Sequence, residues 1–438
     1  MGFMRYCGYI LLVFYCFFAV GCESKVGEEY EMSDSPRYQR RSSKRGVGFS
    51  FEVQPTIDAT LLGPATVWWY NWGICPSTTM ENLNQVFGME YIPMAWNGSF
   101  NEDALRDYCA RHPECRYILA YNEPNLTDQC NETPQQSAAN WPKLKNIADD
   151  LGLKIVSPAM NYGTLAGYSD PIKWLDEFFG LVPIEDVDAI AIHCYMSNAA
   201  AVKSYIDRFD KYNKPIWLTE FCAWENSIND AEDQMRYMSE IIAYLEAEPK
   251  VERYAWFIPR ASGPLDKYPY MQLLTPTAPF ELSPLGKVFV NMSTQDDSVY
   301  AVVNQKIEAE HYVRCNASDC IGTTTFSAAP HLRPSTDLIT EFNINDLELF
   351  NFSSNKWVEY QVELTEARDY ELELRYSSFI DATIKFSVDG SDVAIEVLPN
   401  TNSVWMSKSI KFRASAGRHC IRINVLNGSL SLNNIIIK

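Results

Sequence analysis

Residues 117–124 of the chain read Tyr-Ile-Leu-Ala-Tyr-Asn-Glu-Pro, an apolar run that ends at Glu123. Residues 215–221 read Pro-Ile-Trp-Leu-Thr-Glu-Phe and place Glu220 at the end of a second such run. Short apolar runs of this kind predict buried parallel strands. A carboxylate at the end of a buried strand is costly to place there without a use. The two glutamates therefore indicate a shared cleft at the carboxyl edge of a sheet.

Six further apolar runs alternate with amphipathic helical stretches, which is the pattern of a parallel α/β fold. The eight predicted strands are 47–51, 66–71, 91–95, 117–123, 154–159, 188–195, 215–220 and 253–257. Eight strands in about 250 residues predict a (β/α)8 TIM barrel, with its active site at the carboxyl ends of the strands. A doubly wound sheet is the alternative, but no glycine-rich phosphate loop follows the first run.

The pattern changes after the predicted barrel, which we place at residues 46–292. Residues 293–303 are polar and lack periodicity, so we interpret them as a linker. Beyond them, short alternating segments such as 356–362 and 384–388 are separated by turns such as Asp389-Gly390. This pattern predicts an all-β sandwich, jelly-roll-like, over residues 304–438.

The N-terminus has the pattern of a targeting segment. Residues 9–20 are apolar, and Ala19-Val20-Gly21-Cys22 is similar to a bacterial lipobox. We therefore expect residues 1–22 to be a signal peptide, Cys22 to carry lipid, and residues 23–45 to form a flexible tether. An ordinary signal peptide is the alternative. In either case we expect export, with the protein lipid-anchored at a bacterial cell surface or outer membrane, or otherwise secreted.

The net charge and the aromatic content of the chain indicate which kind of molecule it binds. The formal net charge of −19 argues against nucleic acid, whose phosphates would be repelled. Eleven Trp and 25 Tyr favour a carbohydrate ligand, because aromatic faces stack on sugar rings, although large aromatic cores would explain them equally well. We expect a monomer whose only membrane contact is the lipid anchor.

Two carboxylates facing one cleft are what glycoside hydrolysis needs, one to protonate the leaving oxygen and one to attack or to activate water. Partial burial can raise the pKa of Glu123 enough for it to act as an acid. Asn122 is placed to hydrogen-bond a sugar hydroxyl. At the end of the sixth predicted strand, Tyr195 could donate to Glu220, and His193 could orient that carboxylate or a sugar hydroxyl.

Aromatic and amide side chains follow several of the predicted strands. Alternation along a strand should turn about half of them into the cleft, and the others belong to the core. Trp256 is the preferred sugar-stacking platform. The other candidates for sugar binding are Trp68, Trp69, Trp96 and Asn161.

This set of motifs resembles glycoside hydrolase family 128. The resemblance covers residues 46–292 and rests on residues 48–50, 68–72, 121–125, 193–195 and 219–221. It implies hydrolysis of β-1,3-glucan with retention of configuration. We expect endo action, with exo action left open by the sequence. Carried over, Glu123 would be the acid/base and Glu220 the nucleophile, with no metal and no cofactor in catalysis.

The C-terminal region resembles a family 6 carbohydrate-binding module. The resemblance rests on residues 307–312, 357–360 and 388–390, and it implies that Trp405 stacks on sugar and that a structural calcium is held in the module. At residues 431–434 the chain reads Ser-Leu-Asn-Asn, where the family usually shows an Asn that binds sugar and an Asp that helps to hold calcium. A purely structural β-domain is the alternative.

Two other functions compete with β-1,3-glucan hydrolysis. The same chemistry could act on another β-glycan, such as a mixed-linkage glucan. A barrel without activity could instead serve as a surface glycan-binding protein, but that function would predict the loss of Glu123 or Glu220, and both are present.

Overall fold

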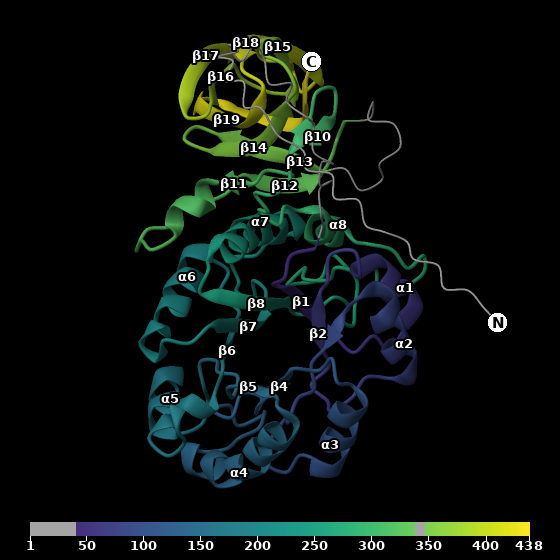
Figure 1. Cartoon of the computed structure of the whole chain (residues 1–438), viewed down its shortest axis with the longest axis vertical. Coiled ribbons are helices and arrows are strands. Elements are labelled where there is room, and N and C mark those ends of the chain that lie inside the picture. Colours follow the sequence, from purple (N-terminus) through teal and green to yellow (C-terminus); the bar gives the residue numbers. More distant parts are fainter. Residues whose placement is uncertain (1–40, 338–346) are drawn as a thin grey trace, which may run out of the picture.

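The computed structural model describes residues 41–337 and 347–438, which form an α/β barrel with a β-sandwich stacked against its outer wall (Figure 1). The predicted signal peptide, Cys22 and most of the predicted tether lie outside the described residues. None of the helices within those two described ranges is long and apolar enough to cross a membrane.

Eight parallel strands form the barrel, and each contains or overlaps one of the predicted runs. Hydrogen bonding gives the order β3-β2-β1-β8-β7-β6 and a separate pair β4-β5. Parallel bridges from Met94 to Leu119 and from Val156 to Ala189 join these two groups into a ring. The strands are β1 (Arg45–Gly48), β2 (Trp68–Tyr70), β3 (Glu90–Tyr91), β4 (Tyr117–Leu119), β5 (Lys154–Val156), β6 (Ile190–Cys194), β7 (Ile216–Phe221) and β8 (Val251–Trp256). The prediction of a TIM barrel is confirmed.

Helices alternate with these strands and surround them (Figure 1). The longest, α4, begins at a capping box in which Thr133 and Gln136 satisfy each other's backbone N–H groups, and it ends at Gly152 with φ +67°. The helices are α1 (Pro55–Leu62), α2 (Thr78–Phe87), α3 (Glu102–Arg111), α4 (Pro134–Leu151), α5 (Pro171–Phe179), α6 (Ala199–Asp207), α7 (Ala231–Ala247) and α8 (Pro284–Asn291), with 3-10 turns η1 (Ile184–Asp186), η2 (Asp210–Tyr212) and η3 (Asn316–Cys320).

The barrel interior is filled near the amino ends of its strands. Trp68 and Trp217 pack 5.3 Å apart there, and the guanidinium of Arg253 lies 4.6 Å from the Trp217 ring. The Trp68 indole donates to the carbonyl of Lys44, just before β1. The prediction that Trp68 binds sugar is therefore wrong, because this side chain is fully buried in the core of the barrel.

Trp69 and Trp256 are also misassigned as sugar-binding residues, since both are fully buried on the helix-facing side of the barrel. The Trp69 indole donates to Asn84 of α2, and the Trp256 ring packs beside Tyr237 of α7. Their strands are apolar on both faces, so the sequence carries no alternation that could tell inward from outward.

The barrel also begins before the predicted tether ends. Arg45, which we assigned to the tether, is a fully buried residue of β1. Its guanidinium pairs with Glu246 at 2.8 Å and donates to the carbonyls of Phe289 and Ser293. A basic residue in a polar segment suggests exposure to solvent. Arg45 is buried instead because its partners, some 200 residues further along the chain, satisfy its charge and its N–H groups.

Two antiparallel sheets form the C-terminal sandwich. One has the order β12-β13-β20-β15-β18, with β10 on β20, and the other has the order β11-β14-β19-β16-β17, with β9 on β14. The strands are β9 (Ala301–Val302), β10 (Lys306–Glu308), β11 (Arg314–Cys315), β12 (His331–Pro334), β13 (Leu347–Ser353), β14 (Trp357–Leu364), β15 (Arg368–Ser377), β16 (Ala382–Val388), β17 (Ser391–Leu398), β18 (Met406–Ala414), β19 (Gly417–Asn427) and β20 (Ser429–Ile437). The prediction of an all-β second domain is confirmed.

The sandwich packs directly on α7 and α8 (Figure 1). His331 Nε2 lies 2.8 Å from Glu240, and the backbone N–H of Leu332 donates to the Ser239 hydroxyl at 2.9 Å. Gln295, in the predicted linker, donates to the carbonyl of Ala243. These contacts hold the sandwich against the side of the barrel, and Gln295 of the predicted linker takes part in them. The end of the predicted linker, Ala301–Val302, is strand β9 of the sandwich.

Candidate active site

Glu220 and Glu123 reach the same cleft from strands on different sides of the barrel. Glu220 lies within β7, and Glu123 lies four residues after the end of β4. The backbone of Glu123 has φ +45°, a left-handed conformation, and its N–H donates to the carbonyl of Ala159. Such a conformation costs of order 1–3 kcal/mol in a residue other than glycine, and it persists where the surroundings enforce it. Here it accompanies a side chain that turns into the barrel mouth.

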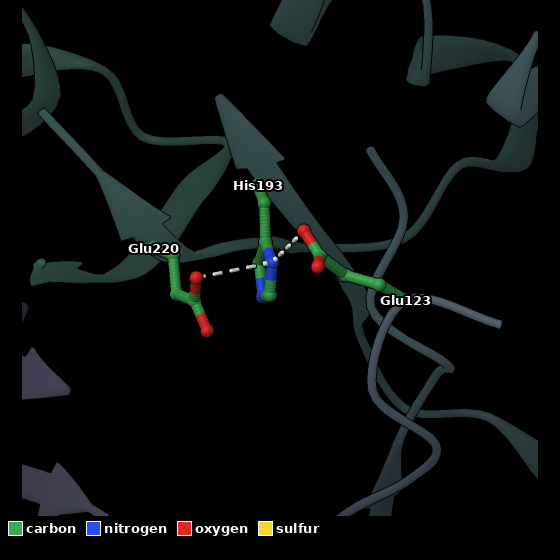
Figure 2. A group of neighbouring side chains, drawn as sticks. All are labelled: Glu123, His193 and Glu220. Atoms are coloured by element: carbon green, nitrogen blue, oxygen red, sulfur yellow. Dashed lines mark hydrogen bonds and ion pairs between the residues drawn. The ribbon is translucent and has the colours of Figure 1, made fainter. Parts of the chain in front are cut away.

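His193, near the carboxyl end of β6, lies between the two carboxylates (Figure 2). Its Nδ1 is 2.8 Å from Oε1 of Glu123 and 3.4 Å from Oε2 of Glu220. One ring nitrogen and one oxygen of each carboxylate all lie within 4.8 Å of one another. The nearest oxygens of the two carboxylates are therefore no more than 4.8 Å apart.

Three aromatic side chains donate hydrogen bonds to Glu220. The Trp72 indole and the Tyr70 hydroxyl reach Oε1 at 2.7 and 3.1 Å, and the Tyr195 hydroxyl bonds to Oε2. Burial, and after it the charge of Glu220, raises the pKa of both Tyr70 and Tyr195 well above its usual value. Both phenols therefore stay protonated and can donate hydrogen bonds to the oxygens of Glu220.

Glu123 has fewer donors. The Asn161 amide donates to its Oε1 at 3.0 Å, and His193 shares the same oxygen. Burial works to raise the pKa of Glu123, but the charge and the hydrogen bond of His193, with the Asn161 bond, outweigh burial and lower that pKa. Burial works to lower the pKa of His193, but the charges of Glu220 and Glu123 outweigh it and raise that pKa. Both directions favour a proton on the imidazole of His193, which faces Oε1 of Glu123 across a 2.8 Å contact.

The two carboxylates open into a cleft of about 620 Å³ at the carboxyl ends of the strands. Among the tryptophans that line the cleft, Trp224 has the most solvent-exposed side chain, at 42%. The centre of its ring lies 6.0 Å from that of Tyr195. The cleft is lined by Trp72, Trp96, Asn122, Glu123, Leu126, Gln129, Asn161, Tyr195, Glu220, Trp224, Phe257 and Ile258. A larger hollow of about 920 Å³ lies at the amino ends of β3, β4 and β5, but neither carboxylate lines it, so volume alone does not locate the chemistry.

The structure brings seven of the predicted site residues to this cleft or to its carboxylates. They are Glu123, Glu220, Asn122, His193, Tyr195, Asn161 and Trp96. It leaves Trp68, Trp69 and Trp256 in the core, and Trp405 lies in the sandwich, where its indole donates to the Thr336 hydroxyl.

Tyr70 and Trp72 are the two hydrogen-bond donors to Glu220 that sequence reasoning did not select. Tyr70 lies in the same predicted run as Trp68 and faces the barrel interior as Trp68 does. Trp72 lies beyond the end of β2 with φ +60°, so strand alternation no longer predicts where its side chain points.

Glu123, His193 and Glu220 are also the one group of acidic and histidine side chains with metal-ligand proximity in residues 41–337 and 347–438. Glu220 already accepts hydrogen bonds from Trp72, Tyr70 and Tyr195, and Glu123 accepts one from Asn161. Within its described residues the sandwich does not bring three such side chains together, and the structural calcium stays a prediction.

A family model for the glycosyl hydrolase catalytic core matches residues 48–289, which is more than half of the chain. The chain belongs to this family. A second model, carbohydrate-binding module family 35, matches residues 332–437, where we expected family 6. The motifs behind that expectation are an opening strand, a core segment around the buried Trp357 and a hairpin turn. A two-sheet sandwich needs these features in any case.

Two solved structures of family 128 resemble this glycosyl hydrolase over its barrel. The subgroup II endo-β-1,3-glucanase from Pseudomonas viridiflava is 35% identical, with a TM-score of 0.53, and the match covers 57% of this chain and 98% of that one. The subgroup II endo-β-1,3-glucanase from Sorangium cellulosum is 32% identical, with a TM-score of 0.50 and the same coverage. The barrel is therefore a family 128 catalytic domain.

One curated protein also matches, the alkali-sensitive linkage protein 1 of Schizosaccharomyces pombe. It is 24% identical over 227 residues, which is 50% of this chain. The match spans only 39% of the length of that protein, so the resemblance is to a part of it.

Proposed function

We propose that this glycosyl hydrolase cleaves β-1,3-glucan within the chain and retains the anomeric configuration. The single observation that carries the mechanism is the placement of one oxygen of each carboxylate within 4.8 Å of the other, which suits the about 5–5.5 Å spacing of a retaining pair. The substrate follows from the two subgroup II relatives, both of which are endo-β-1,3-glucanases.

The reaction has two displacements. In the first, a Glu220 oxygen attacks the anomeric carbon while Glu123 gives its proton to the departing glycosidic oxygen. In the second, Glu123 takes a proton from water, whose oxygen attacks the same carbon and releases Glu220. The hydrogen bonds from Trp72, Tyr70 and Tyr195 hold the side chain of Glu220 in position for this attack. We assign no step to a metal or cofactor.

His193 can exchange a proton with Glu123, the proposed acid/base. Before the first step the proton shared by His193 and Glu123 can sit on Nδ1 or on Oε1, and only the second arrangement protonates the leaving oxygen. Once Glu220 is esterified, its negative charge disappears, which removes the first of the effects that raise the pKa of His193. The imidazole then holds a proton less strongly while Glu123 acts as a base.

This assignment predicts a change in the pH dependence of a His193→Asn variant. In the wild type the shared proton is lost only as the pH rises through the raised pKa of His193, above its usual 6.5. Without the imidazole the proton rests on the Glu123 carboxyl alone, so the alkaline limb of kcat/KM should move toward acid pH by about one unit. Profiles of kcat/KM against pH test this, and an unmoved alkaline limb would contradict it.

Hydrolysis of a panel of polymers tests the proposed substrate. The panel contains a linear β-1,3-glucan, a mixed-linkage β-glucan, a β-1,4-glucan and a β-1,4-mannan, with products sized over time. We expect a ladder of oligosaccharides from the β-1,3-glucan that is absent with Glu123→Gln, and initial products of β configuration by NMR. Faster cleavage of the mixed-linkage polymer would transfer the same chemistry to that substrate, and glycan binding without cleavage would favour a non-catalytic role.

We further propose that the protein is an exported monomer, anchored through Cys22, and that the sandwich directs the barrel to polysaccharide. The apolar N-terminal run supports export, and the family 35 match supports a carbohydrate-binding role for the sandwich. Trp405 remains its proposed sugar contact.

A further inference from the structure

Two cysteines meet where α3 joins β4, at the end of the barrel that lies away from the cleft. Cys109 lies in the last turn of α3, and Cys115 lies two residues before β4 begins at Tyr117. The backbone N–H of His112 donates to the carbonyl of Cys109, and the N–H of Cys115 donates to the carbonyl of His112. The chain therefore turns back on the end of the helix, and the two sulfur atoms lie 4.0 Å apart.

The contacts of these two thiols differ from those of other buried cysteines in the chain. Cys109 and Cys115 are both buried, and each has the other thiol as a contact. By comparison, the Cys222 sulfur faces the Met271 sulfur at 3.9 Å, and the Cys320 thiol donates to the carbonyl of Ser327 at 3.7 Å. Two adjacent thiols can be joined to each other, whereas a thiol beside a thioether or a carbonyl has no such partner.

The turn that carries Cys115 has room to move. A disulfide holds its sulfur atoms about 2.05 Å apart, so these two must approach each other by about 2 Å more. His112, Pro113 and Cys115 all line the hollow of about 920 Å³, so one side of the turn faces open space. A small shift of the turn, with rotation of both side chains, therefore does not press on a packed core.

We propose that Cys109 and Cys115 form a disulfide when the chain folds in an oxidising compartment. The pairing is carried by the 4.0 Å contact between the sulfur atoms. Its presence in the cell rests on the proposed export of the chain, because disulfides persist outside the reducing cytosol. The bond ties the end of α3 to the segment that enters β4, the strand that leads to Glu123.

The bond forms by exchange with a disulfide of the compartment, carried by an oxidising protein or by oxidised glutathione. One cysteine thiolate attacks a sulfur of that oxidant, expels its first thiol and leaves a mixed disulfide. The second cysteine thiolate attacks the protein sulfur of the mixed disulfide and expels the other thiol. The two cysteines lose two protons and two electrons, and the oxidant disulfide is reduced to two thiols.

Peptide mapping tests the pairing, because trypsin cuts after Arg111 and so places the two cysteines in separate peptides, 107–111 and 112–116. The full chain is refolded in reduced and oxidised glutathione, its free thiols are alkylated under denaturing conditions, and the digest is analysed by mass spectrometry. We expect the two peptides to be joined and unalkylated in the wild type and in Cys75→Ser, an exposed control, and to be separate in Cys109→Ser. Separate alkylated peptides from the wild type, or a link from either peptide to a third cysteine, would overturn the pairing.

Thermal unfolding measures what the bond contributes to stability. A disulfide that closes a loop as short as residues 109–115 should raise the Tm by about 5 °C, so a reductant should lower the Tm of the wild type by that amount. The double variant Cys109→Ser/Cys115→Ser should not show this loss. A wild-type Tm that does not respond to the reductant, or an equal loss in the double variant, would overturn the proposal. Neither experiment measures turnover, so its failure and a failure of the proposed glucanase activity are distinguishable.

Discussion

Replacing Glu220 by alanine should lower kcat on β-1,3-glucan by about 10⁴-fold or more. The variant loses the atom that attacks the anomeric carbon, and no other carboxylate shares that position, since Glu123 approaches from the β4 side. Three donors, Tyr70, Trp72 and Tyr195, lose their acceptor, so Glu220→Gln serves as a second variant that keeps one oxygen in place. Both proteins should give the far-ultraviolet spectrum of the wild type.

Azide provides the positive half of that test. It should enter the space left in Glu220→Ala and attack the anomeric carbon in one displacement, restoring turnover and giving a glycosyl azide of α configuration. Glu225→Ala, an exposed carboxylate in the loop after β7, is the control and should behave like the wild type. A β-configured azide, or a rate near that of the wild type without azide, would exclude Glu220 as the nucleophile.

The eight barrel strands could be predicted because a buried parallel strand is an apolar run with local boundaries. The same property hid the direction of each side chain, since a run that is apolar on both faces has no alternation to follow. Trp69 and Trp256 were misassigned for this reason, and they face the helices. The direction of Glu123 and Glu220 could be predicted, because a carboxylate at the end of a buried run is stable only where it faces the cleft.

Other features depend on contacts distant in sequence. Arg45 is buried because Glu246 receives it, a pairing that no local pattern near Arg45 could indicate. The orientation of Trp72 depends on a left-handed backbone beyond the end of β2.

Replacing Glu123 by glutamine should slow hydrolysis of β-1,3-glucan about 10³-fold, because the natural leaving group needs a proton. An aryl β-glucoside with an acidic phenol leaves without one, so the first displacement on Glu220 should remain fast in this variant. The second displacement still lacks its base, and we expect a burst of about one phenol per enzyme molecule followed by a slow steady state. Stopped-flow absorbance measures the burst, and Glu225→Gln is the control.

The amide introduced by Glu123→Gln retains an oxygen for the Asn161 donor, so the geometry of the site is preserved. An equal loss of rate on both substrates, with no burst, would show that Glu123 is not the acid/base.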